Sequence, residues 1–426
     1  MRLLIAASLL WSPFAWAEPD QTPYPAKPNP KGLQVQMVDD VLALGVHHAG
    51  INLTLNGLLS PAKDAKPGQP TATAAGFTFV INETYAKSLD RQIKLLSDQG
   101  VVVTAILITY RSPDPRIRAL TVHPDADPAK GTTMAANTVT PEGRACYQAL
   151  TDFIARRWCS ADDSHGRLWG WVISNEVNSH HEWHQMGPAT VAQVAAQYED
   201  QVRLAWESLR RHSAHAKVYL SMEHHWNSQG NADPRQACRG RELLELFAKR
   251  ARERGDFDWN LAFHPYPSNL RDPRTWLDKV TFDDATPKVT FKNLEVLTKK
   301  LAMPELLFAG APRRLSLTEQ GFNVTQRPEA LAEQAAAYAY AWEKISRLSG
   351  GIDAFLYHRQ VDHAKEGGLR FGLWSNKEGT VLTPDQKRPI WFLLKAAGTP
   401  EWPAAATPYL KTCGLQSWDE LAPKKN

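Results

Sequence analysis

The chain has 426 residues, of which 43% are hydrophobic and 22% are charged, and its formal net charge is +4. This composition is typical of a globular protein and excludes an intrinsically disordered chain. The positive charge is small and evenly spread, so we expect no nucleic-acid partner.

The N-terminus has the features of a secretion signal. Arg2 supplies the positive charge, an apolar run covers residues 3–10, and Ala15-Trp16-Ala17 forms a cleavage site of the small-x-small type. The apolar run is too short to span a membrane, so we expect no membrane partner. We expect residues 1–17 to be removed from a secreted or periplasmic protein, and residues 18–33 to form a proline-rich, extended leader.

Strand-like and helix-like patterns then alternate along the chain. The expected strands are residues 33–37, 49–55, 101–109, 168–173, 217–222, 259–263, 315–318 and 352–357. The expected helical segments are residues 38–44, 86–98, 141–159, 190–211, 241–254, 289–301, 328–348 and 387–397. This alternation predicts an α/β protein with a (β/α)8 TIM barrel as its single domain over residues 34–398, followed by a loosely packed polar tail over residues 399–426. A doubly wound sheet is the alternative, and residues 111–141 are expected to form a long loop.

Two of the expected strands end in glutamate. The apolar stretch Leu168–Ile173 leads into Asn175-Glu176, and Leu315–Thr318 leads directly into Glu319. An unpaired buried charge is costly, and the carboxyl ends of barrel strands are where active sites form. The two glutamates therefore favour a hydrolase that uses a pair of carboxylates.

The order of these motifs resembles clan A of the retaining glycoside hydrolases, and we expect a bacterial family of that clan. Asn175-Glu176 falls on the fourth strand, His264-Pro265-Tyr266 on the sixth and Glu319 on the seventh. The resemblance implies that Glu176 is the acid/base and Glu319 the nucleophile of a double displacement. It also implies that Tyr266 binds Glu319, that Asn175 binds the sugar 2-hydroxyl and that His264 lines the same subsite.

Other residues at strand ends are candidates for substrate binding. They are Asn52, Glu223, His224, Trp226, Tyr357 and Trp374. Many clan members place an arginine where Asn52 stands and a tryptophan after the eighth strand, a place that Trp374 could fill from the next loop. His358 and Arg359 could suit an acidic sugar, but we expect Arg359 to be a solvated loop residue. The 15 tryptophans fit sugar stacking and core packing equally well.

Two alternatives remain open at this stage. His180, His184 and His224 favour a metal-dependent hydrolase, because His180 and His184 have the i, i+4 spacing of a helical metal pair. A barrel that binds carbohydrate without turnover would carry the same motifs. The preferred interpretation is a monomeric glycoside hydrolase that acts on a polysaccharide or oligosaccharide and needs no cofactor or metal. The 4 cysteines allow one or two disulfides, with the pairing undetermined.

Overall fold

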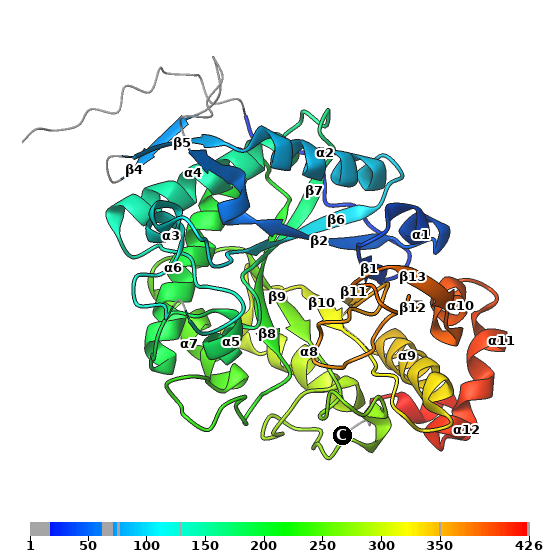
Figure 1. The fold of residues 1–426 in the computed structure, drawn as a ribbon. Coiled ribbons are helices and arrows are strands. Elements are labelled where there is room, and N and C mark those ends of the chain that lie inside the picture. The colour runs from blue at the N-terminus through cyan, green and yellow to red at the C-terminus, as the bar shows by residue number, and fades with distance from the viewer. Residues whose placement is uncertain (1–17, 62–70, 75–76, 128, 349–350, 424–426) are drawn as a thin grey trace, which may run out of the picture.

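The structure is a computed structural model that describes residues 18–61, 71–74, 77–127, 129–348 and 351–423 (Figure 1). The expected signal segment, residues 1–17, lies outside the described residues. Among the described helices, none is both long and apolar enough to cross a membrane.

Eight parallel strands close into a barrel in the order β1-β11-β10-β9-β8-β7-β6-β2. The strands are β1 (Lys31–Gln34), β2 (His48–Thr54), β6 (Val102–Ile108), β7 (Leu168–Ile173), β8 (Lys217–Glu223), β9 (Trp259–His264), β10 (Leu315–Gln320) and β11 (Ile352–Tyr357). The (β/α)8 prediction is therefore confirmed, and the doubly wound alternative is wrong. The first strand begins at Lys31 instead of residue 33, so residues 31–33 belong to the barrel and not to the leader.

Helices surround the barrel (Figure 1). They include α1 (Val38–Ala43), α2 (Glu83–Ser97), α4 (Pro141–Trp158), α6 (Val191–Arg210), α7 (Gly240–Glu253), α8 (Glu295–Leu301), α9 (Ala330–Ser346) and α10 (Pro389–Ala396). Several begin at a side chain that accepts a hydrogen bond from a free backbone N–H of the first turn. Asn82 caps α2 and Thr140 caps α4, while Thr190 forms a capping box with Gln193 at the start of α6.

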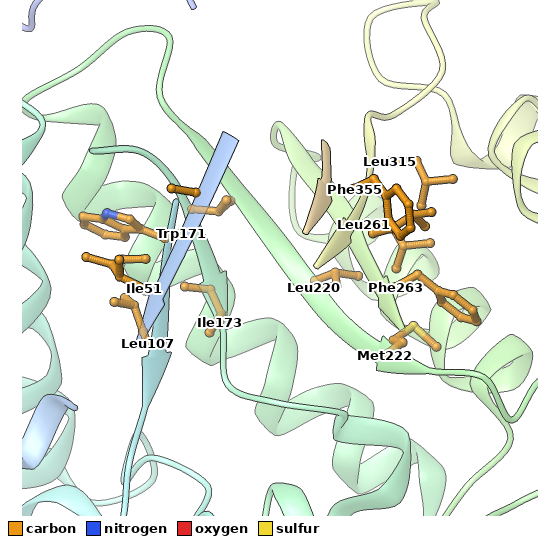
Figure 2. Packing of buried hydrophobic residues seen from close by; sticks show 14 of the residues in the cluster. Ile51, Leu107, Trp171, Ile173, Leu220, Met222, Leu261, Phe263, Leu315 and Phe355 are labelled. Carbon is orange, nitrogen blue, oxygen red and sulfur yellow. The ribbon is translucent and has the colours of Figure 1, made fainter. Parts of the chain in front are cut away.

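Alternation along the strands separates two apolar clusters. Outward residues such as Ile51, Leu107 and Trp171 pack with the helices in the main core (Figure 2). A second cluster fills the barrel interior, because successive strand residues point to opposite faces. It consists of Ile106, Ile108, Val172, Tyr219 and Ala262. The same alternation decides which residues near the strand ends face the site.

Segments predicted to be loops contain short elements. The insertion after β2 forms an antiparallel sheet of β3 (Leu59–Pro61), β5 (Phe77–Ile81) and β4 (Thr71–Ala74), in that order. Helix α3 (Pro115–Thr121) lies within the expected loop 111–141, and β12 (Trp374–Asn376) pairs with β13 (Pro384–Lys387). Shorter elements are α5 (His180–Trp183), α11 (Trp402–Ala406), α12 (Leu410–Cys413) and 3-10 turns at Leu55–Leu58, Val177–Ser179, Thr275–Leu277, Phe291–Asn293, Pro304–Leu306, Thr407–Tyr409 and Trp418–Leu421.

The leader and the tail both pack on the barrel. Tyr24 of the leader makes an edge contact with Trp169, near the start of β7, and Asp20 pairs with Arg167. The leader thus lies at the amino ends of the strands, opposite the candidate site. In the tail, Trp402 and Trp418 are buried in the main core, so the expectation of loose packing is wrong.

All four cysteines are buried free thiols. They are Cys146, Cys159, Cys238 and Cys413. None of the disulfides that the sequence allowed forms in this structure, and burial raises the pKa of each thiol, which leaves them unreactive.

Candidate active site

The carboxyl ends of β7, β9 and β10 bring the two glutamates together. One carboxylate oxygen of Glu176, one of Glu319 and a ring nitrogen of His264 all lie within 4.8 Å of one another. Glu176 is buried and Glu319 is half-buried. Carboxyl groups about 5–5.5 Å apart are suited to direct attack on a sugar carbon, whereas about 6.5–9.5 Å leaves room for an intervening water molecule.

The backbone after β7 directs Glu176 into the site. Ser174 has φ 66° and Glu176 has φ 40°, both in the left-handed region that side chains other than glycine rarely adopt. Such a conformation costs roughly 1–3 kcal/mol per residue and persists where neighbouring contacts hold it. Here the Glu176 N–H donates to Ser221 Oγ over 2.9 Å, and Ser174 Oγ lies 2.6 Å from His184 Nδ1.

The surroundings of Glu319 favour its ionised form. Tyr266 donates its hydroxyl to Oε1 over 3.0 Å, and Gln34 donates its amide to Oε2 over 3.2 Å. Burial by itself raises the pKa of Glu319, but charge on His358 and His264, together with these two hydrogen bonds, brings the pKa below its ordinary value. Burial and nearby carboxylates raise the pKa of Tyr266, so its hydroxyl remains a donor.

The surroundings of Glu176 favour its protonated form. Burial and the charge of Glu319 raise its pKa, and His264 opposes this rise only in part. His264 Nδ1 lies 2.8 Å from Glu176 Oε1, and its Nε2 lies 3.1 Å from Thr318 Oγ1. Burial lowers the pKa of His264, but Glu176, Glu319 and Glu223 raise it above the ordinary value. An imidazolium that donates from both nitrogens fits these contacts.

Glu223, at the end of β8, adds a third buried carboxyl group. It accepts hydrogen bonds from Asn178 Nδ2 (2.7 Å), Ser179 Oγ (3.0 Å) and the His225 N–H (2.9 Å). Burial and the charge of Glu176 raise its pKa to about 7. Glu223 therefore lies within electrostatic reach of the Glu176 side chain.

Three further predicted residues lie around these carboxyl groups. Asn175 is buried beside Glu176, and its side-chain amide forms no hydrogen bond with any described residue, so it is free for a ligand. Asn52 is exposed on β2, in register with the interior residue Ile106. His224 is buried, with Nε2 3.7 Å from Glu223 Oε2.

Of the three predicted aromatic contacts, two are buried and cannot serve as sugar platforms. Trp226 is fully buried and donates Nε1–H to Asp284, and Tyr357 is fully buried with its hydroxyl bound to the Phe371 carbonyl. Trp374 is partly exposed, but its Nε1–H binds Asp40 and Lys387 Nζ lies 5.0 Å from its ring centroid. The predictions for Trp226 and Tyr357 were therefore wrong, while the role of Trp374 as a sugar platform stays a prediction.

The proposed histidine metal set does not assemble. Both ring nitrogens of His184 are engaged, by Ser174 and by Gln197, and burial lowers its pKa to about 3. His180 Nε2 binds the Arg235 carbonyl. Within the described part of the chain, ligand atoms converge instead at Glu176–His264–Glu319 and at Glu223–His224–His225. In the first group both nitrogens of His264 already form hydrogen bonds, which leaves neither free for a cation.

The sequence did not point to Gln34, Glu366 or Tyr110, which lie at or beside the site. Gln34 orients Glu319 and is itself bound by His358 Nδ1 over 2.6 Å. His358 also binds Glu366, and Arg359 pairs with Glu366, so Arg359 is not a solvated loop residue. Tyr110, just beyond β6, is 37% exposed, and its pKa is raised by burial and by the charge of Glu319. Gln34 follows the outward Leu33, so strand alternation could have identified it.

The molecule is thus a (β/α)8 barrel with a close pair of carboxyl groups at the carboxyl ends of its strands. The chain belongs to the protein family of unknown function DUF5722, which it matches over residues 23–421. No curated protein sequence matches it.

Several solved structures share the fold. A family 39 glycoside hydrolase from Bacteroides cellulosilyticus WH2 superposes with a TM-score of 0.54 and 13% identity over 88% of this chain. This chain spans 64% of that protein, less than two thirds of its length. A hyperthermophilic β-glucosidase from Pyrococcus furiosus gives a TM-score of 0.52 and 14% identity, with coverage of 88% of this chain and 86% of that one. At these identities the likeness shows the fold alone.

Proposed function

We propose that the protein is a retaining glycoside hydrolase of clan A type that acts on a polysaccharide or oligosaccharide. The observation that carries the proposal is the carboxyl pair: Glu176 and Glu319 within 4.8 Å, with surroundings that shift their pKa values in opposite directions. Two carboxyl groups separated in this way supply one acid and one nucleophile. The barrel likeness to glycoside hydrolases is consistent with this chemistry.

In the proposed reaction, ionised Glu319 attacks the anomeric carbon while Glu176 transfers its proton to the departing glycosidic oxygen. The product is a glycosyl ester on Glu319 and a free alcohol. Glu176, now a carboxylate, then takes a proton from water, whose oxygen attacks the same carbon and releases Glu319. Tyr266 and Gln34 hold Glu319 in place, and Asn175 is positioned to bind the sugar 2-hydroxyl.

Removal of the nucleophile tests this assignment. Glu319→Ala should lower kcat by at least about 10³-fold on any glycoside that the wild type cleaves. Azide should restore part of the activity, because it can enter the space of the missing carboxylate and attack the anomeric carbon. Circular dichroism and the melting temperature check that the fold is retained. Unchanged activity of Glu319→Ala would refute the role. If no glycoside in a broad panel is cleaved by the wild type but some are bound, the carbohydrate-binding alternative replaces the enzyme.

The acid role of Glu176 is tested separately. Glu176→Gln should reduce kcat/KM much more for alkyl glycosides than for aryl glycosides with acidic leaving groups, which depart without protonation. Equal losses for the two classes would rule out the acid role.

We also propose that the protein acts outside the cytoplasm. The basis is the N-terminal sequence pattern, and N-terminal sequencing of the exported protein should find Glu18 or a close neighbour as the first residue. Detection of an uncleaved N-terminus in the cytoplasm would refute export.

A further inference from the structure

A cavity lies beside the chain that follows Glu223. It has a volume of about 450 Å³ and lies between the segment after β8 and the segment after β9. Its walls include His225, Ser268, Asp278, Lys279 and Lys288. His225 connects the cavity to the candidate active site, because its backbone N–H donates to Glu223. Glu223 in turn lies close enough to Glu176 for the charge of Glu176 to raise its pKa.

The cavity contains cations without counterions. Neither Lys279 nor Lys288 forms an ion pair with any residue that the structure describes. Lys279 is exposed, and Lys288 is half-buried with its Nζ donating only to the Ser268 carbonyl over 2.8 Å. An ammonium group has three donors and no acceptor, so both lysines retain capacity for an acceptor ligand.

The acidic residues of the cavity are already engaged. Asp272 pairs with Arg274 and Arg327. Asp278 accepts from the Ser268 N–H over 3.0 Å and from Thr275 Oγ1 over 3.0 Å. These two aspartates therefore have partners of their own, while the two lysines have no acidic partner among the described residues.

The position of Lys288 favours an anionic ligand. Burial lowers its pKa, while the charges of Glu223 and Asp278 raise it in part. A half-buried ammonium without a close counterion has lost part of its hydration, and an anion placed beside it restores favourable interactions. Its backbone is fixed, because the segment pairs with the chain after β8 through the His225–Lys288 bridge and the Val289 N–H to His224 carbonyl bond of 2.9 Å.

We propose that this cavity is a subsite for an acidic sugar, in which Lys279 and Lys288 bind a carboxylate or a sulfate ester on the substrate. The inference rests on the proposed function, which it deepens by giving the substrate an anionic group on the side of the site formed by the segments after β8 and β9. It differs from the sequence expectation for His358 and Arg359, since those side chains are both bound to Glu366.

Binding to an inactive variant tests the subsite independently of turnover. Isothermal titration calorimetry on full-length Glu319→Gln would compare a uronic-acid tetrasaccharide with its methyl ester, and a sulfated tetrasaccharide with its desulfated form. We expect at least one acidic ligand to bind at least 10-fold more tightly than its neutral counterpart. The two pairs distinguish a carboxylate from a sulfate. Equal affinity within both pairs would overturn the proposal.

Lysine variants in the same background locate the site. Lys279→Gln/Lys288→Gln should remove most of the preference for the acidic ligand, and its affinity should become less dependent on salt. Lys249→Gln, a matched change on an exposed face of α7, should leave both unchanged. Because Lys279 is exposed, the single variant Lys279→Gln keeps the test valid if Lys288→Gln disturbs the fold. Retention of the full preference in both variants would refute the subsite.

The outcomes separate the two proposals. Lysine-dependent binding of acidic ligands without any turnover by the wild type would support the subsite and refute the enzymatic function. Turnover of neutral glycans that is unaffected by the lysine changes, with no preference for acidic ligands, would support the function and refute the subsite.

Discussion

Glu176 and Glu319 are chemically identical side chains that differ in proton affinity because of their immediate neighbours. Glu319 accepts hydrogen bonds from Tyr266 and Gln34 and lies near the charges of His264 and His358, which stabilise the anion. Glu176 is more deeply buried, and the negative charge of Glu319 disfavours a second anion nearby. The single contact from His264 does not reverse this effect. The surrounding side chains therefore determine which of the two glutamates holds a proton and which is ionised.

The pH dependence of kcat/KM should be bell-shaped. Activity requires Glu319 without its proton, so the rate falls as the pH drops through the Glu319 pKa, which lies below its ordinary value of 4.5. Activity also requires Glu176 with its proton, so the rate falls as the pH rises through the Glu176 pKa, which lies above 4.5. Initial rates across pH measure both limbs. A rate that rises continuously into the alkaline range would contradict this assignment.

Tyr266→Phe tests how much the hydrogen bond from Tyr266 stabilises the ionised form of Glu319. Loss of the hydroxyl removes a donor that lowers the pKa of Glu319, so the acid limb of the profile should move to higher pH. We expect kcat to fall roughly 10–100-fold, because a hydrogen bond to a charged group contributes about 1.5–3 kcal/mol. Tyr409→Phe, on the distant 3-10 turn Thr407–Tyr409, is the matched control. An unshifted acid limb would mean that Tyr266 does not act through Glu319.

At the scale of the elements, strand alternation explains which predictions from sequence succeeded. His264 follows the outward Phe263 and therefore faces the interior, as predicted. Tyr357 shares the outward face with Phe355, so it packs in the core, and the next residue, His358, faces Gln34 instead. The apolar strands were recognisable because strands buried on both faces form continuous apolar runs.

Other parts of the site depend on contacts between segments distant in the sequence. Trp226 is buried because the chain after β8 pairs with residues 287–289, through the Trp226 N–H to Pro287 carbonyl bond of 3.0 Å. No local pattern predicts that pairing. The left-handed backbone at Ser174 and Glu176 is likewise invisible in the sequence, because neither residue is glycine. The small sheet β3-β5-β4 was missed because β3 and β4 flank a polar stretch that contains glycine and proline, although β5 (Phe77–Ile81) has the aromatic and β-branched residues typical of a strand.

The C-terminal helices are expected to be part of the stable fold. Trp402 is 8% exposed, packs against Tyr338 and Trp342 of α9, and donates Nε1–H to Glu343. Trp402→Ala should therefore lower the free energy of unfolding by about 3–5 kcal/mol. Lys411→Ala, at an exposed position of the same segment, should have little effect. Urea unfolding of both variants gives the comparison, and equal stability would show that the tail contributes nothing to the core.

For the molecule as a whole, the packing of the leader and the candidate active site lie at opposite ends of the barrel. The leader packs against the amino ends of the strands through Tyr24 and Asp20, while the titratable cluster lies at the carboxyl ends. This arrangement is usual for (β/α)8 barrels and places Glu176, Glu319 and the lysine-lined cavity on the same face.

The configuration of the sugar first released by the wild type shows whether Glu319 acts as the nucleophile of a retaining reaction. Proton NMR during early turnover of a glycoside with known anomeric configuration distinguishes the two outcomes before mutarotation mixes them. We expect retention, because one carboxylate oxygen of Glu176 lies within 4.8 Å of one of Glu319 and Glu319 attacks the anomeric carbon itself. Release of the inverted sugar would show that water attacks directly, and would contradict the assignment of Glu319 as nucleophile.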